Sequence, residues 1–183
     1  YSGGQLTDWG AHHIDIALWG MGACETGPVA IKNAKGKFAD HPIYNTAVEY
    51  YFEAIFKNGV KMIVSNRGRG GVTFEGEKGS VWANRGRHNA DPKSILESKI
   101  ADDEIHLYKS SNHVKNFVDS VFTRKPTVAP VEHAHRAVSI AHLGNIAMIL
   151  RRDIAWDPEK ETIPGDPGAD FLLNRAYRRP WVL

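Results

Sequence analysis

The side chains best suited to acid–base chemistry lie close together near the start of the chain. Asp8, His12 and Asp15 are spaced i, i+4 and i+7 within a largely apolar stretch, residues 5–21, that we expect to be a buried helix. At about 100° per residue, this spacing places the three side chains in one narrow stripe. Histidine exchanges protons near neutral pH, and a neighbouring carboxylate can orient its ring. The stripe therefore favours a proton-relay site centred on His12.

Two other interpretations of this stripe stay open. The three side chains could form a hydrogen-bonded ladder that holds a buried helix in place without any catalytic role. They could also bind zinc or manganese, although two histidines at i and i+4 would be a stronger sign than the adjacent His12 and His13. His13 projects about 100° away from the stripe, so we expect it to pack beside the site or to support binding there.

Other motifs predict less. A second polar stripe on a long helix is explained by packing as well as by ligand binding; it contains Glu132, His135, Ser139 and His142. The Arg-Gly run at residues 67–71 lacks the Gly-Lys-Ser/Thr of a phosphate loop and is expected to connect two strands. Cys24 is the only cysteine, which excludes a disulfide within the chain and a cysteine-based zinc site.

The elements that must position the stripe alternate between helix and strand patterns. Strand patterns cover residues 29–38, 47–56, 60–65, 71–74 and 80–83, followed by helix patterns at 112–122 and 131–150, a short strand near 154–156 and a short helix at 166–173. Asn58-Gly59 between two strand patterns is typical of a β-hairpin. This order predicts an α+β fold in which helices pack on one face of a mostly antiparallel sheet.

Composition narrows the class of partner. The chain has 183 residues, enough for one domain, and a net charge of only +2, which gives no sign of a nucleic-acid partner. No apolar run approaches the roughly 20 residues that span a bilayer, so no membrane partner is expected. Nothing in the sequence indicates a cellular location.

The motif around the stripe resembles a known family. Gly3-Gly4, followed by Asp8-x-Gly10-x-His12-x-x-Asp15, is similar to the opening of the C-terminal domain in the Gfo/Idh/MocA superfamily, which includes glucose-fructose oxidoreductase and inositol dehydrogenase. Segments 71–79, 112–117, 142–147, 155–158 and 177–181 resemble later parts of the same domain in its bacterial branch. Together these segments extend over nearly the whole chain.

The resemblance implies a role for the stripe. It implies that His12 and Asp8 lie beside the reacting carbon of a sugar, cyclitol or glycoside, and that Asp15 and His13 help to bind this substrate. It also implies that NAD or NADP is held by a separate N-terminal Rossmann domain with a glycine loop and a catalytic lysine. Neither motif is present in residues 1–183, so we expect the chain to bind no cofactor and to be inactive alone.

The resemblance further implies a homo-oligomer formed through the open face of the sheet. Residues 47–56 agree with this, because their second face mixes Tyr51 and Ile55 with charged side chains. Two alternatives to a dehydrogenase half remain: a related enzyme that cleaves glycosides by transient oxidation, and a stand-alone carbohydrate-binding or interaction module.

Overall fold

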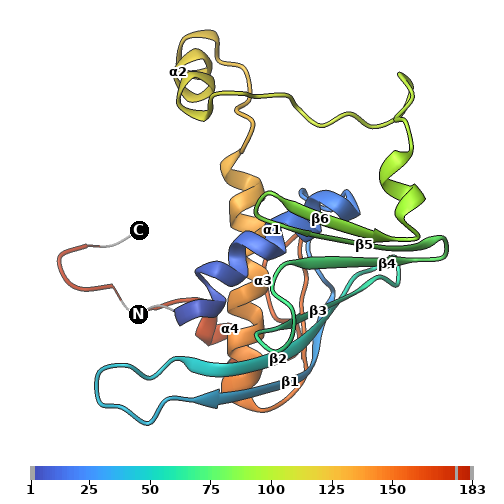
Figure 1. Cartoon of the computed structure of the whole chain (residues 1–183). Helices are drawn as coiled ribbons and strands as arrows, with labels where there is room; N and C mark the ends of the chain where they lie inside the picture. The colour runs from blue at the N-terminus through green and yellow to red at the C-terminus, as the bar shows by residue number, and fades with distance from the viewer. Residues whose placement is uncertain (1–2, 176, 182–183) are drawn as a thin grey trace.

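The structure is a computed structural model that describes residues 3–175 and 177–181. It confirms the α+β class (Figure 1). The helices are α1 (Trp9–Met21), α2 (His113–Thr123), α3 (Val131–Leu150) and α4 (Pro167–Asp170), with short 3-10 turns at Gly4–Leu6, Lys93–Glu97 and Phe171–Leu173. The strands are β1 (Ala30–Phe38), β2 (Ala47–Ile55), β3 (Lys61–Ser65), β4 (Val72–Gly76), β5 (Gly79–Asn84), β6 (Arg87–Asp91) and β7 (Ile154–Ala155).

The larger sheet has the strand order β3-β2-β1-β7, and all its pairs are antiparallel. β2 and β3 form the hairpin that Asn58-Gly59 predicts. Along β2, the side chains of Tyr50, Phe52 and Ala54 alternate inward as expected, but Val48 is exposed and Ala47 is buried instead. The alternation changes phase because the register between β1 and β2 shifts between Lys37 and Phe38.

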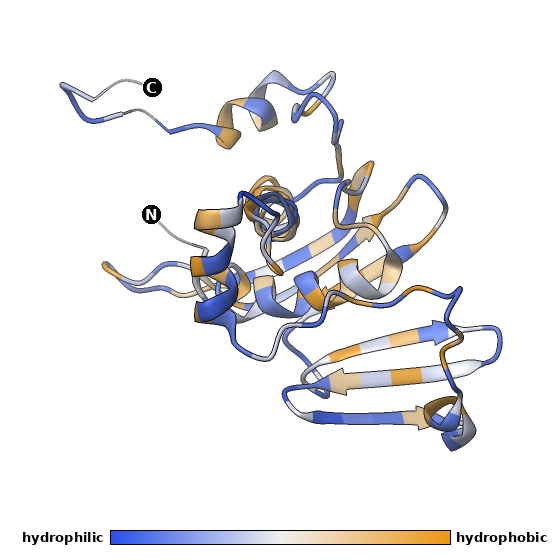
Figure 2. Ribbon diagram, turned by 90° about the horizontal axis from the view of Figure 1, so that it is seen from above, coloured by the Kyte–Doolittle hydropathy of each residue, from blue (hydrophilic) through white to orange (hydrophobic). Residues whose placement is uncertain are grey.

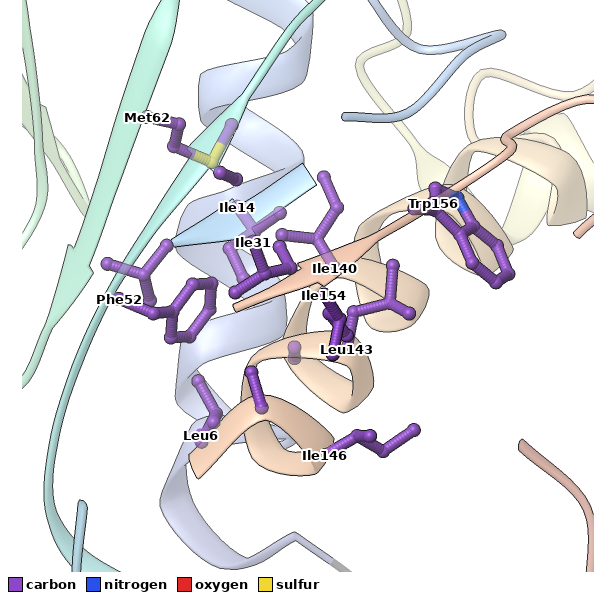
Figure 3. Packing of buried hydrophobic residues seen from close by; sticks show 14 of the residues in the cluster. Leu6, Ile14, Ile31, Phe52, Met62, Ile140, Leu143, Ile146, Ile154 and Trp156 are labelled. Atoms are coloured by element: carbon purple, nitrogen blue, oxygen red, sulfur yellow. The ribbon is translucent and has the colours of Figure 1, made fainter. Parts of the chain in front are cut away.

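Helices α1 and α3 pack against each other, α3 lies on β1 and β2, and α1 reaches β3. Their shared core contains Phe52, Ile31 and Leu143, each at most 1% exposed (Figure 3). At Gly144, α3 approaches β2 so closely that a Cβ atom added there would lie 2.6 Å from Cδ1 of Phe52. This contact helps to fix the position of α3 relative to the sheet and to α1. The N-terminal turn of α3 is positioned by the same contact.

The remaining strands form a second sheet, with the order β4-β5-β6, beside the main body (Figure 2). We expected one sheet, but β4 packs against α1 rather than continuing from β3. The ring of Phe74 lies where a side chain at Gly20 would be, so the absence of a Cβ allows this docking. β6 was not predicted, because its sequence, Arg-His-Asn-Ala-Asp, has low β-propensity.

Helix α2 stands apart from the rest of the fold (Figure 1). Its N-cap is Asn112, whose Oδ1 accepts a hydrogen bond from Lys115 N at 2.9 Å. No residue of α2 is buried, although apolar side chains recur every three or four residues along one face: Val114, Phe117, Val118, Val121 and Phe122. No described helix is long and apolar enough to cross a membrane.

Candidate functional site

The stripe on α1 is shorter than its spacing suggests. Asp8 is the N-cap residue, with φ −101° and ψ −96°, and it makes no capping hydrogen bond through its side chain. Its backbone is therefore not helical, so the projection that the i, i+4, i+7 spacing assumes does not apply to it. His12 and Asp15 lie within the helix and share a hollow, but Asp8 is exposed and does not line it. The structure thus brings together two of the three residues.

This hollow, of about 510 Å³, lies between α1 and the beginning of α3. We call it the histidine hollow. Its lining residues are Ala11, His12, Asp15 and Trp19 from α1, and Ala129, Pro130, Val131, His133, Ala134, His135, Ala137 and Val138 from α3 and the segment before it. The walls are mainly apolar, so the polar groups that could act on a ligand are the imidazoles of His12, His133 and His135 and the carboxylate of Asp15.

His12 is available to a ligand. Its side chain is exposed at the hollow, and its ring lies edge-on to the Trp9 ring with 5.5 Å between centroids. His12 makes no hydrogen bond to any residue that the structure describes, so neither aspartate orients its ring. The hydrogen-bonded ladder is therefore not formed, and the ring nitrogens of His12 are free to donate to or accept from a bound hydroxyl.

Asp15 and His133 are two other titratable groups in the histidine hollow. Burial raises the pKa of Asp15 above its ordinary value, and the nearby His133 and His12 lower it in part. His133 Nε2 lies 2.7 Å from Glu25 Oε1, so a neutral His133 donates there and keeps Nδ1 as an acceptor. This Nδ1 is buried and has no hydrogen-bond partner among residues 3–175 and 177–181. Since this nitrogen is enclosed by the protein, it is the rest of the His133 ring that faces a ligand in the hollow.

The metal-binding interpretation of the stripe requires Asp8, His12 and Asp15 to surround one ion, but Asp8 lies outside the hollow that the other two share. In the described part of the chain, no group of three or more His, Cys, Asp or Glu side chains is placed to hold a metal ion.

Two residues of the second polar stripe, Glu132 and His135, form polar contacts within the chain. Glu132 pairs with Arg136 at 2.7 Å, and His135 Nε2 lies 2.8 Å from Glu161 Oε1. His142 is exposed and lies outside the histidine hollow.

His13 faces a different hollow from its neighbour His12. Its Nε2 lies 3.4 Å from Asn84 Oδ1 on β5. The second hollow, of about 620 Å³, is lined by Trp9, His13, Arg69, Gly70, Trp82, Asn84, Arg85 and Arg87. We call it the arginine cleft. Since the ring of Trp9 contacts His12 and also lines this cleft, one side chain separates the two hollows.

Sequence reasoning missed several of these residues. We expected α1 to be buried on all sides, but Trp9 is 49% and Trp19 38% exposed, and each lines one of the hollows. His133 gave no signal because its importance depends on α3 lying beside α1. A large aromatic residue on a helix with histidines could have indicated a binding surface, since an exposed tryptophan is unusual.

The whole chain, residues 1–183, matches the oxidoreductase family, C-terminal alpha/beta domain, of the Gfo/Idh/MocA type. No curated protein matches the sequence. Among solved structures, an NAD-binding protein from Listeria innocua has a TM-score of 0.58 at 14% identity, over 83% of this chain and 47% of that one. The protein yvaA of Bacillus subtilis, proposed to be an oxidoreductase, has a TM-score of 0.55 at 13% identity, over 84% of this chain and 53% of that one.

The chain thus spans about half the length of these two proteins. At such low identity, the structural similarity shows the fold alone, whereas the match over all 183 residues shows the family. The Gly3-Gly4 to Asp15 motif, the α+β fold and the full-length match agree with one another. The chain belongs to the oxidoreductase family of Gfo/Idh/MocA C-terminal alpha/beta domains.

Proposed function

We propose that the chain is the substrate-binding half of a nicotinamide-dependent oxidoreductase that acts on a sugar, a cyclitol or a glycoside. The observation that carries this proposal is the unpaired His12 in a hollow that it shares with Asp15 and His133. The family supports an oxidoreductase, and the NAD-binding protein of similar fold from Listeria innocua supports the choice of cofactor.

The chain itself offers no fit for a dinucleotide. Every strand pair among the described residues is antiparallel, so the crevice between parallel strands and helices that holds a pyrophosphate is not formed there. Residues 1–183 also contain no Gly-x-Gly-x-x-Gly turn between a strand and a helix. We therefore assign the cofactor to a separate dinucleotide-binding domain and confine the roles below to residues of this chain.

Oxidation of a secondary hydroxyl removes a proton from oxygen and a hydride from carbon. His12 accepts the proton, because its nitrogens are unpaired and its side chain is open to the histidine hollow. The carboxylate of Asp15, close enough to His12 for their charges to interact, stabilises the imidazolium that results. His133 lines the same hollow, so its ring contacts the bound substrate. A nicotinamide supplies the hydride acceptor in this class of reaction. A direct role for Asp8, which lies outside the hollow, stays a prediction.

The first test concerns the gene. We expect the reading frame to continue upstream of Tyr1 and to encode a strand, a Gly-x-Gly-x-x-Gly turn and a helix. A reading frame that begins near Tyr1 would contradict the proposal and would favour a stand-alone carbohydrate-binding module.

The second test is kinetic and uses the product of the whole reading frame. His12→Ala should lower turnover by about 10²–10⁴-fold, the usual contribution of a general acid–base group. The matched control is His88→Ala, since His88 is exposed on β6 and lines neither hollow. Sugar-dependent accumulation of reduced cofactor is expected. Glycoside cleavage without net reduction would instead identify the related cleaving activity, and normal turnover in His12→Ala would exclude the proton role.

A further inference from the structure

The arginine cleft carries an excess of positive charge. Arg69, Arg85 and Arg87 line it, and neither Asp nor Glu is among its lining residues. Within residues 3–175 and 177–181, none of these three arginines forms an ion pair. Other arginines of the same part of the chain do: Arg67 pairs with Glu49, and Arg152 with Asp166. Unpaired guanidinium groups gathered in a concave site attract an anion.

Two of these three guanidinium groups lie against tryptophan rings. The Cζ atom of Arg69 lies 3.4 Å from the centroid of the Trp82 ring, and that of Arg85 lies 5.3 Å from the centroid of the Trp9 ring. Contact with an aromatic face restrains an arginine without neutralising its charge. The guanidinium N–H groups therefore remain available for carboxylate or phosphate oxygens, to which they can donate in pairs.

The loop between β3 and β4 is held against β5 before any ligand binds. Gly70 O accepts hydrogen bonds from Trp82 Nε1 at 3.1 Å and from Asn84 Nδ2 at 3.4 Å. At the next residue, Gly71, φ is +111° and a Cβ atom would lie 2.6 Å from Ala83 O, so only glycine allows this approach. Such an arrangement reduces the entropy that binding would otherwise cost.

We propose that the arginine cleft binds the carboxylate or phosphate group of an acidic sugar, which makes an anionic carbohydrate the substrate class of this chain. The inference rests on the proposed function for the sugar itself and on the cleft for the charge. A sugar has apolar faces that lie against tryptophan, and Trp9 and Trp82 both line the cleft. Because the Trp9 ring also contacts the His12 ring, a ligand anchored by Arg85 is one side chain away from the proton acceptor.

Calorimetric titration of the 183-residue chain tests this inference without cofactor or turnover. Glucuronate and glucose 6-phosphate distinguish the two anionic groups, while glucose and inorganic phosphate represent the ring and the anion alone. At least one acidic sugar should bind about tenfold or more tightly than both glucose and phosphate, as expected for a hydrogen-bonded charge pair. If glucose binds as tightly as both acidic sugars, the cleft does not recognise the negative charge. If inorganic phosphate binds as tightly as the acidic sugars, the cleft does not recognise the sugar ring. Either result would overturn the proposal.

Variants show whether the cleft is the site. Arg85→Gln/Arg87→Gln should weaken binding of the acidic sugar by about tenfold or more, and Arg69→Gln provides a second, independent removal of charge. The matched control is Arg151→Gln, because Arg151 is exposed at the end of α3 and lies outside the cleft. Circular dichroism verifies that each variant is folded. Unchanged binding in both cleft variants, or tighter binding of a short single-stranded RNA than of either sugar, would overturn the proposal.

The result is separable from the proposed function. Binding of an acidic sugar by the chain stands even if the product of the whole reading frame shows no redox activity. Oxidation of a neutral sugar by that protein, without acidic-sugar binding by this chain, would remove the substrate class and leave the oxidoreductase role.

Discussion

The close approach of α3 to the larger sheet at Gly144 offers a quantitative test of the scaffold that places His133 beside α1. In Gly144→Ala, the new methyl group would lie 2.6 Å from Cδ1 of Phe52 and closer still to Cε1 and Cζ. Carbon atoms at optimal separation are about 3.5–4.0 Å apart. Phe52 is fully buried, so its ring has no open space into which it can turn.

Two effects of opposite sign determine the size of the change. Insertion of a methyl group into a packed core costs about 1–3 kcal/mol, and three overlapping ring atoms place this site near the upper limit. Replacement of glycine by alanine within a helix contributes about 1 kcal/mol in favour of folding. We therefore expect Gly144→Ala to lower the free energy of unfolding by about 2 kcal/mol.

Urea unfolding followed by circular dichroism measures this difference, and a second background isolates its cause. Phe52→Leu shortens the side chain that causes the overlap, so Gly144→Ala in that background should be neutral or slightly stabilising. Gly168→Ala is the matched control, because the nearest atom to its added Cβ is 3.6 Å away. It should be tolerated or slightly stabilising.

Two outcomes of these unfolding measurements would refute the proposed overlap between residues 144 and 52. If Gly144→Ala destabilises the protein equally with Phe52 and with Leu at position 52, the two sites do not interact and the close approach is not the cause. A stabilising Gly144→Ala in the wild-type background would show that α3 lies farther from β2 than the structure places it.

Three further predictions concern charge, cofactor and assembly. Burial raises the pKa of Asp15, with His133 and His12 opposing this effect, so the ionised carboxylate lowers the stability of the folded chain. In urea unfolding, Asp15→Asn should therefore be no more stable than the wild type below about pH 3.9, and its gain in unfolding free energy should grow as pH rises through the raised pKa. A gain that is the same at every pH would contradict this. The chain alone should bind neither NAD nor NADP, and saturable binding at about micromolar cofactor in calorimetry would show a site that the antiparallel sheets do not explain. The chain should form a dimer through the open face of the larger sheet, where Ile63 is 54% exposed; in light scattering, Ile63→Glu should yield a monomer, whereas a monomer only in Phe117→Glu would place the interface on α2.

Much of the local structure was predictable from the sequence. Residues 131–150 were expected to be helical and form α3 with those bounds, because the apolar pattern begins after a proline and ends near two arginines. The hairpin of β2 and β3 followed from Asn58-Gly59, whose local preference needs no distant contact. β6 could not be predicted in this way, because its polar sequence becomes a strand only by pairing with β5.

The candidate site was predictable in part. The spacing of His12 and Asp15 placed both on one side of α1, and the motif around them indicated the family. Asp8 was assigned to the same stripe, but the helix begins only after it. Helical spacing describes side-chain directions within a helix and does not decide at which residue the helix starts.

The sequence by itself determined the α+β class, the family and the histidine of the proposed chemistry, since these depend on local patterns and on motifs of a few residues. Only the tertiary structure decided which distant residues complete each hollow. His133 reaches the histidine hollow because α3 packs on α1, and Arg69 and Trp82 reach the arginine cleft because β4 docks on α1 near Gly20. Such contacts join residues far apart in the chain, and they depend on how closely the elements pack rather than on the pattern within any one of them.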